Sequence, residues 1–453
     1  MMNNNLGRFE LFDLKFPFIF RANSAHEVLY YSPGLLLIVD PLFSTVFEKQ
    51  LRCNSEDSSE FVKNLLQAEN KAENFWEDFI FSKYEPTCLT LYHNQVCNLQ
   101  CNYCFSANQT GNERFLSIPG VLSAADLVVK NCLKIGKDLT VVFHGGGEPS
   151  ISWRDINLVN QALDDVSQVN GIAIRRYIAT NAVMSVVKAN WLTKSFDLVG
   201  ISCDGPSQIQ DSQRRAKNDT SSSKILERTT QILHDNGTRV HVRVTITQET
   251  INRQEEICQY ICEVLKPSAI HIGPVYLGGR TSEENLIENS DIFLENFFSA
   301  QSCAEKYGLK WELSSSRWNE LHGAHCNLYK QVLQLIPGEI ATVCFKNISE
   351  FQSNSNCMTI GHYDNERNLF ILDEEKILML KSNYSIPKKC DTCFLKYQCS
   401  HDCPNSCLLL DDYCNKSNLC EINQKIGYKK IEKYLSSYVP NQLITMIRTD
   451  QLR

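Results

Sequence analysis

Three cysteines at positions 97, 101 and 104 form a CxxxCxxC pattern within one short segment. Three thiolates on one loop can hold three irons of a [4Fe–4S] cube and leave the fourth iron without a protein ligand. That open iron can chelate the amino and carboxylate groups of a small molecule and pass an electron to it. A zinc-binding knuckle is the alternative, although zinc usually takes four ligands in closely paired spacing.

A second group of cysteines lies toward the end of the chain. It begins with the spacing Cx2Cx5Cx3C and comprises Cys390, Cys393, Cys399, Cys403, Cys407, Cys414 and Cys420, with Cys326 and Cys344 upstream. So many thiols cannot serve one cube, which implies at least two further metal sites. A structural zinc ribbon over the same cysteines is the alternative.

Polar and glycine residues follow three of the predicted strands. Gly146 and Gly147 can expose backbone groups to the amine of a ligand, and Glu148 with Pro149 fixes the turn, although a plain tight turn has the same composition. Asn181 follows the next predicted strand, and Ser202 and Asp204 lie at the end of the one after it. Two arginines, Arg214 and Arg215, come shortly afterwards.

The elements that position these residues alternate between strands and helices from residue 86 onward. The predicted strands are Thr87 to His93, Leu139 to Phe143, Ile174 to Thr180, Asp197 to Cys203, Arg239 to Thr247 and Ala269 to Tyr276. Helical periodicity lies between them: Val121, Ala125, Val128 and Cys132 recur at helical spacing, with Ser123 and Asp126 fitting a cap. Six such units in series predict an α/β fold with a parallel sheet curved into a partial (β/α)6 barrel.

Three domains follow from these patterns. Residues 1–85 contain two predicted strand regions and a helix, and predict a small N-terminal α+β domain. Residues 86–285 form the partial barrel. Residues 286–453 contain linker helices and a Cys-rich region with few strong strand signals, whose order is expected to depend on bound metal.

Composition excludes several classes of protein. The chain has 453 residues, 45 basic and 52 acidic side chains and a net charge of −7, so no basic field indicates nucleic-acid binding. No apolar run approaches the ~20 residues that span a bilayer, and the N-terminus has no export signal. Twenty cysteines in a chain without an export signal favour metal sites over disulfides. We therefore expect a soluble, cytoplasmic protein that binds neither nucleic acid nor membranes.

The first cysteine pattern resembles the cluster motif of the radical S-adenosylmethionine (SAM) enzymes, with an aromatic residue before Cys104. The segment from Gly146 to Glu148 resembles that family's GGE motif for the methionine amino group. Thr180 and Asn181 resemble its "TNG" turn with Ala182 in place of glycine. The segment Ser202 to Pro206 resembles its "SxDGP" segment. The resemblance implies that Ser202 and Asp204 contact the polar end of the cofactor and that Arg214 or Arg215 binds its carboxylate.

The C-terminal cysteines resemble the SPASM extension of radical SAM peptide maturases, which shares its cysteines between two auxiliary [4Fe–4S] clusters. The resemblance assigns one cluster to Cys390, Cys393, Cys399 and Cys420, and the other to Cys326, Cys344 and Cys403. No cysteine lies shortly before Cys326 where some relatives have one, and the nearby candidates are His322, His325 and Cys303.

The resemblance implies an enzyme with three [4Fe–4S] clusters and SAM as cofactor. Its expected substrate is a ribosomal precursor peptide, in which a 5′-deoxyadenosyl radical abstracts hydrogen and an oxidative cross-link forms. A flavodoxin- or ferredoxin-type reductant is the expected partner. The N-terminal domain is either an element that binds the leader peptide as an added strand or a lid that packs on the barrel. Two alternatives stay open: an anaerobic sulfatase-maturating enzyme that makes formylglycine, and a non-catalytic zinc-rich binding protein. The sequence names no catalytic side chain.

Overall fold

The computed structural model describes most of the chain in two compact units. The described residues are 5–6, 9–13, 18–22, 28–53, 58–106, 115–217, 220–317, 320–345, 358–383, 386, 388–401, 418–436 and 444–448. The first unit contains Met1–Ser82, Ser315–His325 and Tyr384–Arg453, and the second contains Lys83–Ser314 and Cys326–Asn383. The N-terminal residues and the Cys-rich residues after 384 therefore belong to one unit, whereas the sequence predicted a separate domain for each.

The second unit is built on a sheet whose central strands are parallel. These strands are β6 (Cys88–Leu91), β7 (Leu139–Phe143), β8 (Ile174–Thr180), β9 (Leu198–Ser202), β10 (Arg239–Ile246) and β11 (Ala269–Pro274). They lie side by side in chain order, which confirms the predicted α/β partial barrel. Two further parallel strands were not predicted: β12 (Trp311–Leu313) pairs with β11, and β13 (Val332–Ile336) pairs with β6.

An antiparallel extension continues the sheet beyond β13. It consists of β14 (Ile340–Thr342), β15 (Thr359–Asp364) and β16 (Leu369–Leu372). The prediction of few strands in this part of the chain was wrong, because strands of three to six residues are too short to show a clear period of two.

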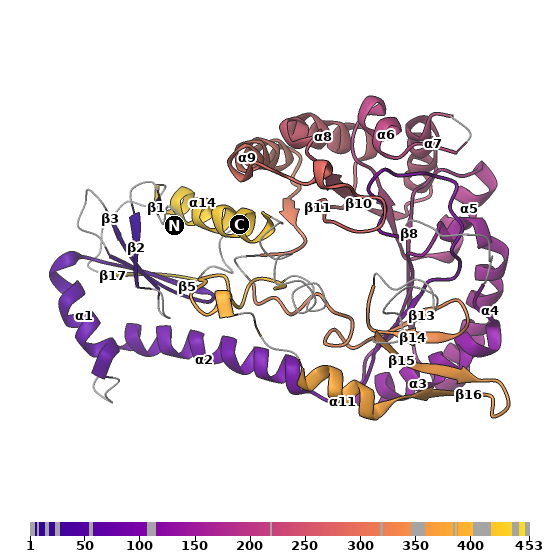
Figure 1. Ribbon diagram of the computed structural model, residues 1–453, viewed down its shortest axis with the longest axis horizontal. Helices are drawn as coiled ribbons and strands as arrows, with labels where there is room; N and C mark the ends of the chain where they lie inside the picture. The colour runs from indigo at the N-terminus through magenta and orange to yellow at the C-terminus, as the bar shows by residue number, and fades with distance from the viewer. Residues whose placement is uncertain are drawn as a thin grey trace. The chain divides into compact units, whose positions relative to one another are not determined.

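Helices follow the barrel strands and lie on the outer side of the sheet (Figure 1). They are α3 (Ile118–Ile135), α4 (Trp153–Asn170), α5 (Val186–Ser195), α6 (Ser207–Gln213), α7 (Ser222–Asp235), α8 (Gln254–Tyr260) and α9 (Ser290–Lys306), with α11 (Glu374–Ser382) later in the chain. Helix α3 buries Val121, Val128 and Cys132 as its periodicity predicts. Its cap is Ser117, whose hydroxyl accepts from the Gly120 N–H (3.2 Å), and the predicted cap at Ser123 and Asp126 was wrong.

The two faces of the barrel strands differ in chemistry. In β10, Val240, Val242, Val244 and Ile246 are buried, and the alternate residues are exposed or half-buried. Because the helices cover the apolar face, the alternate residues lie on the inner face of the curved sheet. This inner face carries the side chains that form the site.

The first unit contains an antiparallel sheet. Its strands run in the order β1 (Asn5–Leu6), β2 (Phe9–Asp13), β3 (Phe18–Ala22), β4 (Val28–Ser32), β5 (Leu35–Val39) and β17 (Ile444–Arg448). Helices α1 (Pro41–Cys53) and α2 (Glu60–Phe81) follow β5, and Tyr30, Leu37, Val62 and Leu65 lie in the shared core. Helix α14 (Leu419–Ser436) precedes β17. Among the helices of the described ranges, none has the length and hydropathy needed to cross a bilayer.

Candidate functional site

The segment with the three N-terminal cysteines follows β6 and is held from two sides. On one side it pairs with the chain after α6. There the Gln100 N–H donates to the Arg215 carbonyl (2.7 Å), and the Lys217 N–H donates to the Asn98 carbonyl (3.1 Å). On the other side the Arg280 N–H donates to the Cys104 carbonyl (3.1 Å). These backbone bonds fix the cysteine loop without using the thiols.

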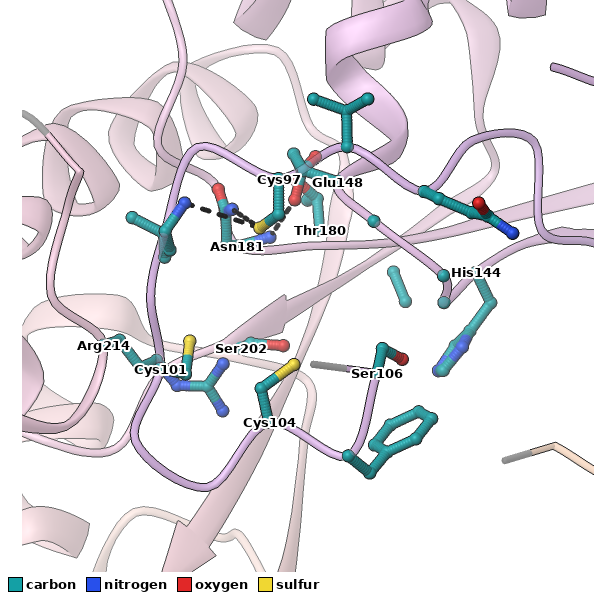
Figure 2. A pocket seen from close by; sticks show the side chains of 18 of the residues that line it. Cys97, Cys101, Cys104, Ser106, His144, Glu148, Thr180, Asn181, Ser202 and Arg214 are labelled. Carbon is teal, nitrogen blue, oxygen red and sulfur yellow. Dashed lines mark hydrogen bonds between the residues drawn. The ribbon is translucent and has the colours of Figure 1, made fainter. Parts of the chain in front are cut away.

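The three cysteines open into a cavity of about 640 Å³. Its wall also includes His144 to Glu148 after β7, Ala179 to Asn181 at the end of β8, and Ser202 at the end of β9. Figure 2 shows the side chains of Cys97, Cys101 and Cys104 around this space, with Arg214 and Ser202 nearby. The cavity therefore lies at the carboxyl ends of the parallel strands, where ligands bind in barrels of this kind.

The cysteines of this loop fit the protein ligands of a [4Fe–4S] cluster. None of the three forms a disulfide. Burial, aided by the Glu148 carboxylate, raises the pKa of Cys97 to about 11, and burial raises that of Cys101 to about 12. A metal must therefore displace protons that these thiols hold at neutral pH. Among the described residues, no three His, Cys, Asp or Glu side chains converge on a point suited to one ion. A cube needs no such point, because each cysteine binds its own iron.

The glycine turn after β7 lies directly against the cysteine loop. A Cβ at Gly146 would be 2.4 Å from the Asn94 carbonyl oxygen, and a Cβ at Gly147 would be 2.0 Å from that of Val96. Glycine is therefore required here because two backbone segments approach closely. The Glu148 N–H donates to the Val96 carbonyl (2.7 Å), which ties the turn to the residue before Cys97.

The Glu148 carboxylate is occupied by the protein itself. It is 2% exposed and accepts hydrogen bonds from the Thr180 hydroxyl (2.6 Å), the Asn181 N–H (2.7 Å) and the Ser150 N–H (3.0 Å). It thus joins the end of β7 to the end of β8. The Asn181 amide in turn donates to Asn98 Oδ1 (2.8 Å) and lies 3.8 Å from the Cys97 sulfur.

Asp204 is the centre of a buried polar network and does not itself line the cavity. It is fully buried and accepts from the Tyr103 hydroxyl, the Gln213 amide (3.0 Å), the Thr245 N–H (3.0 Å) and two nitrogens of Arg214 (3.0 and 3.2 Å). Burial alone would lower the pKa of Arg214, but the neighbouring Asp204 carboxylate raises it well above its usual value. Arg214 also lies over the Tyr103 ring. Asp204 thereby holds Tyr103, which lies between Cys101 and Cys104.

The structure brings most of the predicted cofactor residues together. Gly146, Gly147, Glu148, Asn181, Ser202 and Arg214 line the cavity. Asp204 and Arg215 do not belong to its lining. For Asp204 the reason is its network, and for Arg215 it is the pairing of its backbone with the cysteine loop while its side chain is exposed.

The cavity residues that were not predicted from sequence include three that can carry a positive charge, His144, Lys217 and Arg280. Burial, together with the positive charge of Arg243, lowers the pKa of His144 to about 4, so its imidazole is neutral. A signal for Arg280 was present in the preceding Gly278 and Gly279. A Cβ at Gly279 would lie 2.1 Å from the Cys104 carbonyl oxygen.

The cysteines predicted for one auxiliary cluster surround the start of α14. The amides of Asn423 and Gln424 donate to the sulfurs of Cys399 (3.7 Å) and Cys393 (3.4 Å). Cys420 lies three residues before Asn423 and four before Gln424 in the same helix, so it is on the same face as these two residues. The Cys393 N–H donates to the Cys390 carbonyl (3.1 Å).

For the other predicted cluster the described residues include Cys326 and Cys344, and Cys403 lies outside them. The Cys326 thiol donates to the Val343 carbonyl (3.6 Å), next to Cys344. Of the candidates for an additional ligand, Cys303 interacts with Cys258 and Cys262, whose sulfurs are 3.9 Å apart. His322 directs Nδ1 to the Gly323 carbonyl (2.8 Å).

Comparison with known proteins identifies the barrel. Residues 91–261 match the family model described as the radical SAM superfamily. This segment is a radical SAM domain. The match confirms, for this segment, the predicted resemblance to the radical SAM enzymes. Its range contains all three cysteines of the cavity and the predicted cofactor residues.

Similar proteins include a cysteine-type anaerobic sulfatase-maturating enzyme from Clostridium perfringens, 22% identical over 172 residues. That match covers 37% of this chain and 46% of the relative, so the chain spans less than half of the relative's length. Among solved structures, native anSMEcpe with bound AdoMet has a TM-score of 0.55 at 16% identity, over 77% of this chain and 100% of that one. Streptococcus suis SuiB bound to precursor peptide SuiA has a TM-score of 0.50 at 15% identity, over 90% and 97% of the two chains. These similarities concern the fold.

Proposed function

We propose that the protein is a radical SAM peptide maturase that cleaves SAM reductively and forms an oxidative cross-link in a precursor peptide. The observation that carries the proposal is the cavity into which Cys97, Cys101 and Cys104 open. When bound there, a [4Fe–4S] cluster and SAM supply a 5′-deoxyadenosyl radical, which abstracts hydrogen from an unactivated carbon. A flavodoxin- or ferredoxin-type protein would supply the electron.

The residues of the chain would hold and orient these groups. Gly146 and Gly147 leave backbone groups accessible at the cavity, where the methionine amine of the cofactor can bind. The cationic side chains of Arg214, Lys217 and Arg280 suit its carboxylate. Glu148 and Asp204 act one step away, because their carboxylates are occupied by protein donors.

The C-terminal cysteines would hold two auxiliary [4Fe–4S] clusters that take the electron away after the new bond forms. The placement of Cys393 and Cys399 beside the start of α14 supports the first of them. We assign the second to Cys326, Cys344 and Cys403, of which the first two are neighbours. The new bond is carbon–sulfur, carbon–carbon or ether.

A precursor peptide is the proposed substrate because a structure of similar fold, SuiB, was obtained with a precursor peptide. The antiparallel sheet of the first unit, with β1 and β17 as its outer strands, supports leader binding by strand addition. One alternative is favoured by a specific observation: the similarity to a sulfatase-maturating enzyme supports formylglycine formation on a protein substrate.

The test is anaerobic incubation with SAM, a strong reductant and the short peptide encoded beside the gene, followed by mass spectrometry. We expect the peptide to lose two hydrogens per cross-link and 5′-deoxyadenosine to be released. Replacement of a cysteine thiol by an aldehyde oxygen in a sulfatase peptide would support the alternative instead. Absence of any 5′-deoxyadenosine from iron-loaded protein would refute both.

Cysteine variants separate the two kinds of site. Cys101→Ala should abolish cleavage of SAM, whereas Cys393→Ala should retain cleavage but lose the peptide product. The matched control is Cys132→Ala, because this buried thiol lies in α3 and interacts with the carbonyls of Thr87 and Asp138. Full product formation by both Cys101→Ala and Cys393→Ala would show that the assignment of the sites is wrong.

A further inference from the structure

Arg243 lies on the inner face of the barrel sheet, beside the cavity. In the register of β9 and β10 it stands opposite Ser202, which lines the cavity. Its neighbours Val242 and Val244 are fully buried on the other face of the strand, whereas Arg243 is exposed. The guanidinium is therefore accessible to a ligand from the inner side of the sheet.

Two glycines on neighbouring strands make room for polar side chains on this face. A Cβ at Gly273 in β11 would be 2.7 Å from Nη2 of Arg243. A Cβ at Gly200 in β9 would be 1.9 Å from the Tyr177 hydroxyl oxygen. A larger residue at either position would displace the side chain that now lies there. The backbone is thus shaped to hold Arg243 and Tyr177 where they are.

Arg243 has no acidic partner within the part of the chain that the structure describes. The titratable groups that interact with it include Tyr276, Tyr177, Arg214, Tyr103 and His144, and none of these is a carboxylate. The protein that surrounds the inner face of the sheet partly desolvates Arg243 and lowers its pKa, but a guanidinium stays charged at neutral pH. The carboxylate of Glu312, two strands away in the same register, pairs with Lys310 (3.7 Å). An accessible guanidinium without an acidic partner can bind a carboxylate through charge-assisted hydrogen bonds.

Arg243 lies apart from the cations that line the cavity. Arg214 is paired with Asp204, and Arg214, Lys217 and Arg280 line the cavity, whereas Arg243 is absent from its lining. The single carboxylate of SAM therefore has cations of its own. A second carboxylate, from another molecule, is needed to match Arg243.

We propose that Arg243 binds a carboxylate of the substrate peptide, so that the peptide presents an acidic side chain to the inner face of the barrel. The inference rests on the proposed peptide maturase function and adds the chemical class of the substrate. Arg243 is a specificity residue in this scheme. The planar guanidinium can bind a carboxylate through two parallel hydrogen bonds, which a lysine cannot do.

The test measures binding of two blocked tripeptides, acetyl-Ala-Glu-Ala-amide and acetyl-Ala-Gln-Ala-amide, to the full-length, cluster-loaded protein by ligand-observed NMR. The wild type should prefer the glutamate peptide by about tenfold, as expected for hydrogen bonds to a charged group. Arg243→Gln should reduce the ratio to about one, and Arg243→Lys should keep part of it. Gly273→Ala should also weaken it, because the new Cβ displaces the guanidinium. The matched control is Arg239→Gln, an exposed arginine on the same strand and face, which should keep the preference.

A parallel titration with SAM distinguishes the two possible sources of a carboxylate. If Arg243→Gln weakens SAM binding about tenfold and keeps the peptide preference, the ligand is the cofactor and the proposal is overturned. Equal binding of the two tripeptides by the wild type also overturns it. Peptide binding does not require cleavage of SAM. If the wild type cleaves SAM but binds the two tripeptides equally, the carboxylate site alone is refuted. If it prefers the glutamate tripeptide but does not cleave SAM, the proposed function alone is refuted.

Discussion

Replacing Asp204 by asparagine should destabilise the barrel unit because it leaves a buried cation without its partner. Asp204 is fully buried, and Arg214, whose side chain is 10% exposed, donates to both of its oxygens. Breaking a buried ion pair by removing one partner costs about 3–5 kcal/mol. For a unit of this size the cost corresponds to a fall of roughly 10 °C in the unfolding temperature.

The assay is thermal unfolding of anaerobic protein together with iron content per chain. The matched control is Asp211→Asn, because Asp211 accepts from neutral donors, the hydroxyls of Ser221, Ser222 and Ser223. Its replacement leaves no buried charge without a partner and should cost less, about 2 kcal/mol. Combining Asp204→Asn with Arg214→Met removes both charges, so the double variant should be less unstable than the sum of the single variants by about 2 kcal/mol. Equal losses for Asp204→Asn and Asp211→Asn, or strict additivity in the double variant, would refute the ion-pair reasoning.

Other perturbations test the turn after β7. Gly147→Ala places a Cβ 2.0 Å from the Val96 carbonyl oxygen and should cost about 1–3 kcal/mol and lower the iron content; unchanged iron would contradict the close approach. Glu148→Gln turns one acceptor oxygen into a donor that faces protein donors such as the Asn181 N–H, and thermal unfolding should reveal a cost of about 2 kcal/mol; a stability equal to wild type would contradict it. Burial and Arg243 lower the pKa of His144 to about 4, below the value of about 6.5 in the unfolded chain, so its contribution to stability is complete above pH 6.5 and is lost as the pH falls toward 4. His144→Gln should therefore show a smaller fall in unfolding temperature than wild type between about pH 7 and pH 4.5, and equal falls would exclude this histidine as a source of acid sensitivity.

The parts of the fold that sequence could predict are those with a regular period. Strands such as Leu139–Phe143 alternate buried and half-buried residues, and their bounds agree with the prediction. Strand β12 alternates over only three residues, which is too short to indicate a strand, and β13 is apolar along most of its length. Their place in the sheet depends on pairing with β11 and β6, and pairing between distant segments leaves no periodic signal in either one.

The site shows a similar division. The spacing of Cys97, Cys101 and Cys104 could be recognised because all three lie in one short segment. His144 and Arg280 have no such spacing. The register of β7 brings His144 to the cavity, and the close approach of Gly279 to the cysteine loop brings Arg280 there; the glycines before Arg280 indicate a turn but not its position in the fold. The first unit makes the same point, since β17 pairs with β5 from the opposite end of the chain.

The position of Asp204 in its motif does not by itself determine what its carboxylate contacts. A carboxylate at the end of a parallel strand faces either the ligand or the protein, and the choice depends on which donors the fold supplies. Here Tyr103 and Arg214 come from the cysteine loop and from the end of α6, and they occupy the carboxylate before any cofactor binds. Its effect on chemistry must then pass through the loop that carries Cys101 and Cys104, or through Arg214, whose guanidinium it orients. Asp204→Asn should consequently lower iron loading, and the chains that keep their iron should bind SAM more weakly than wild type because Arg214 lines the cavity.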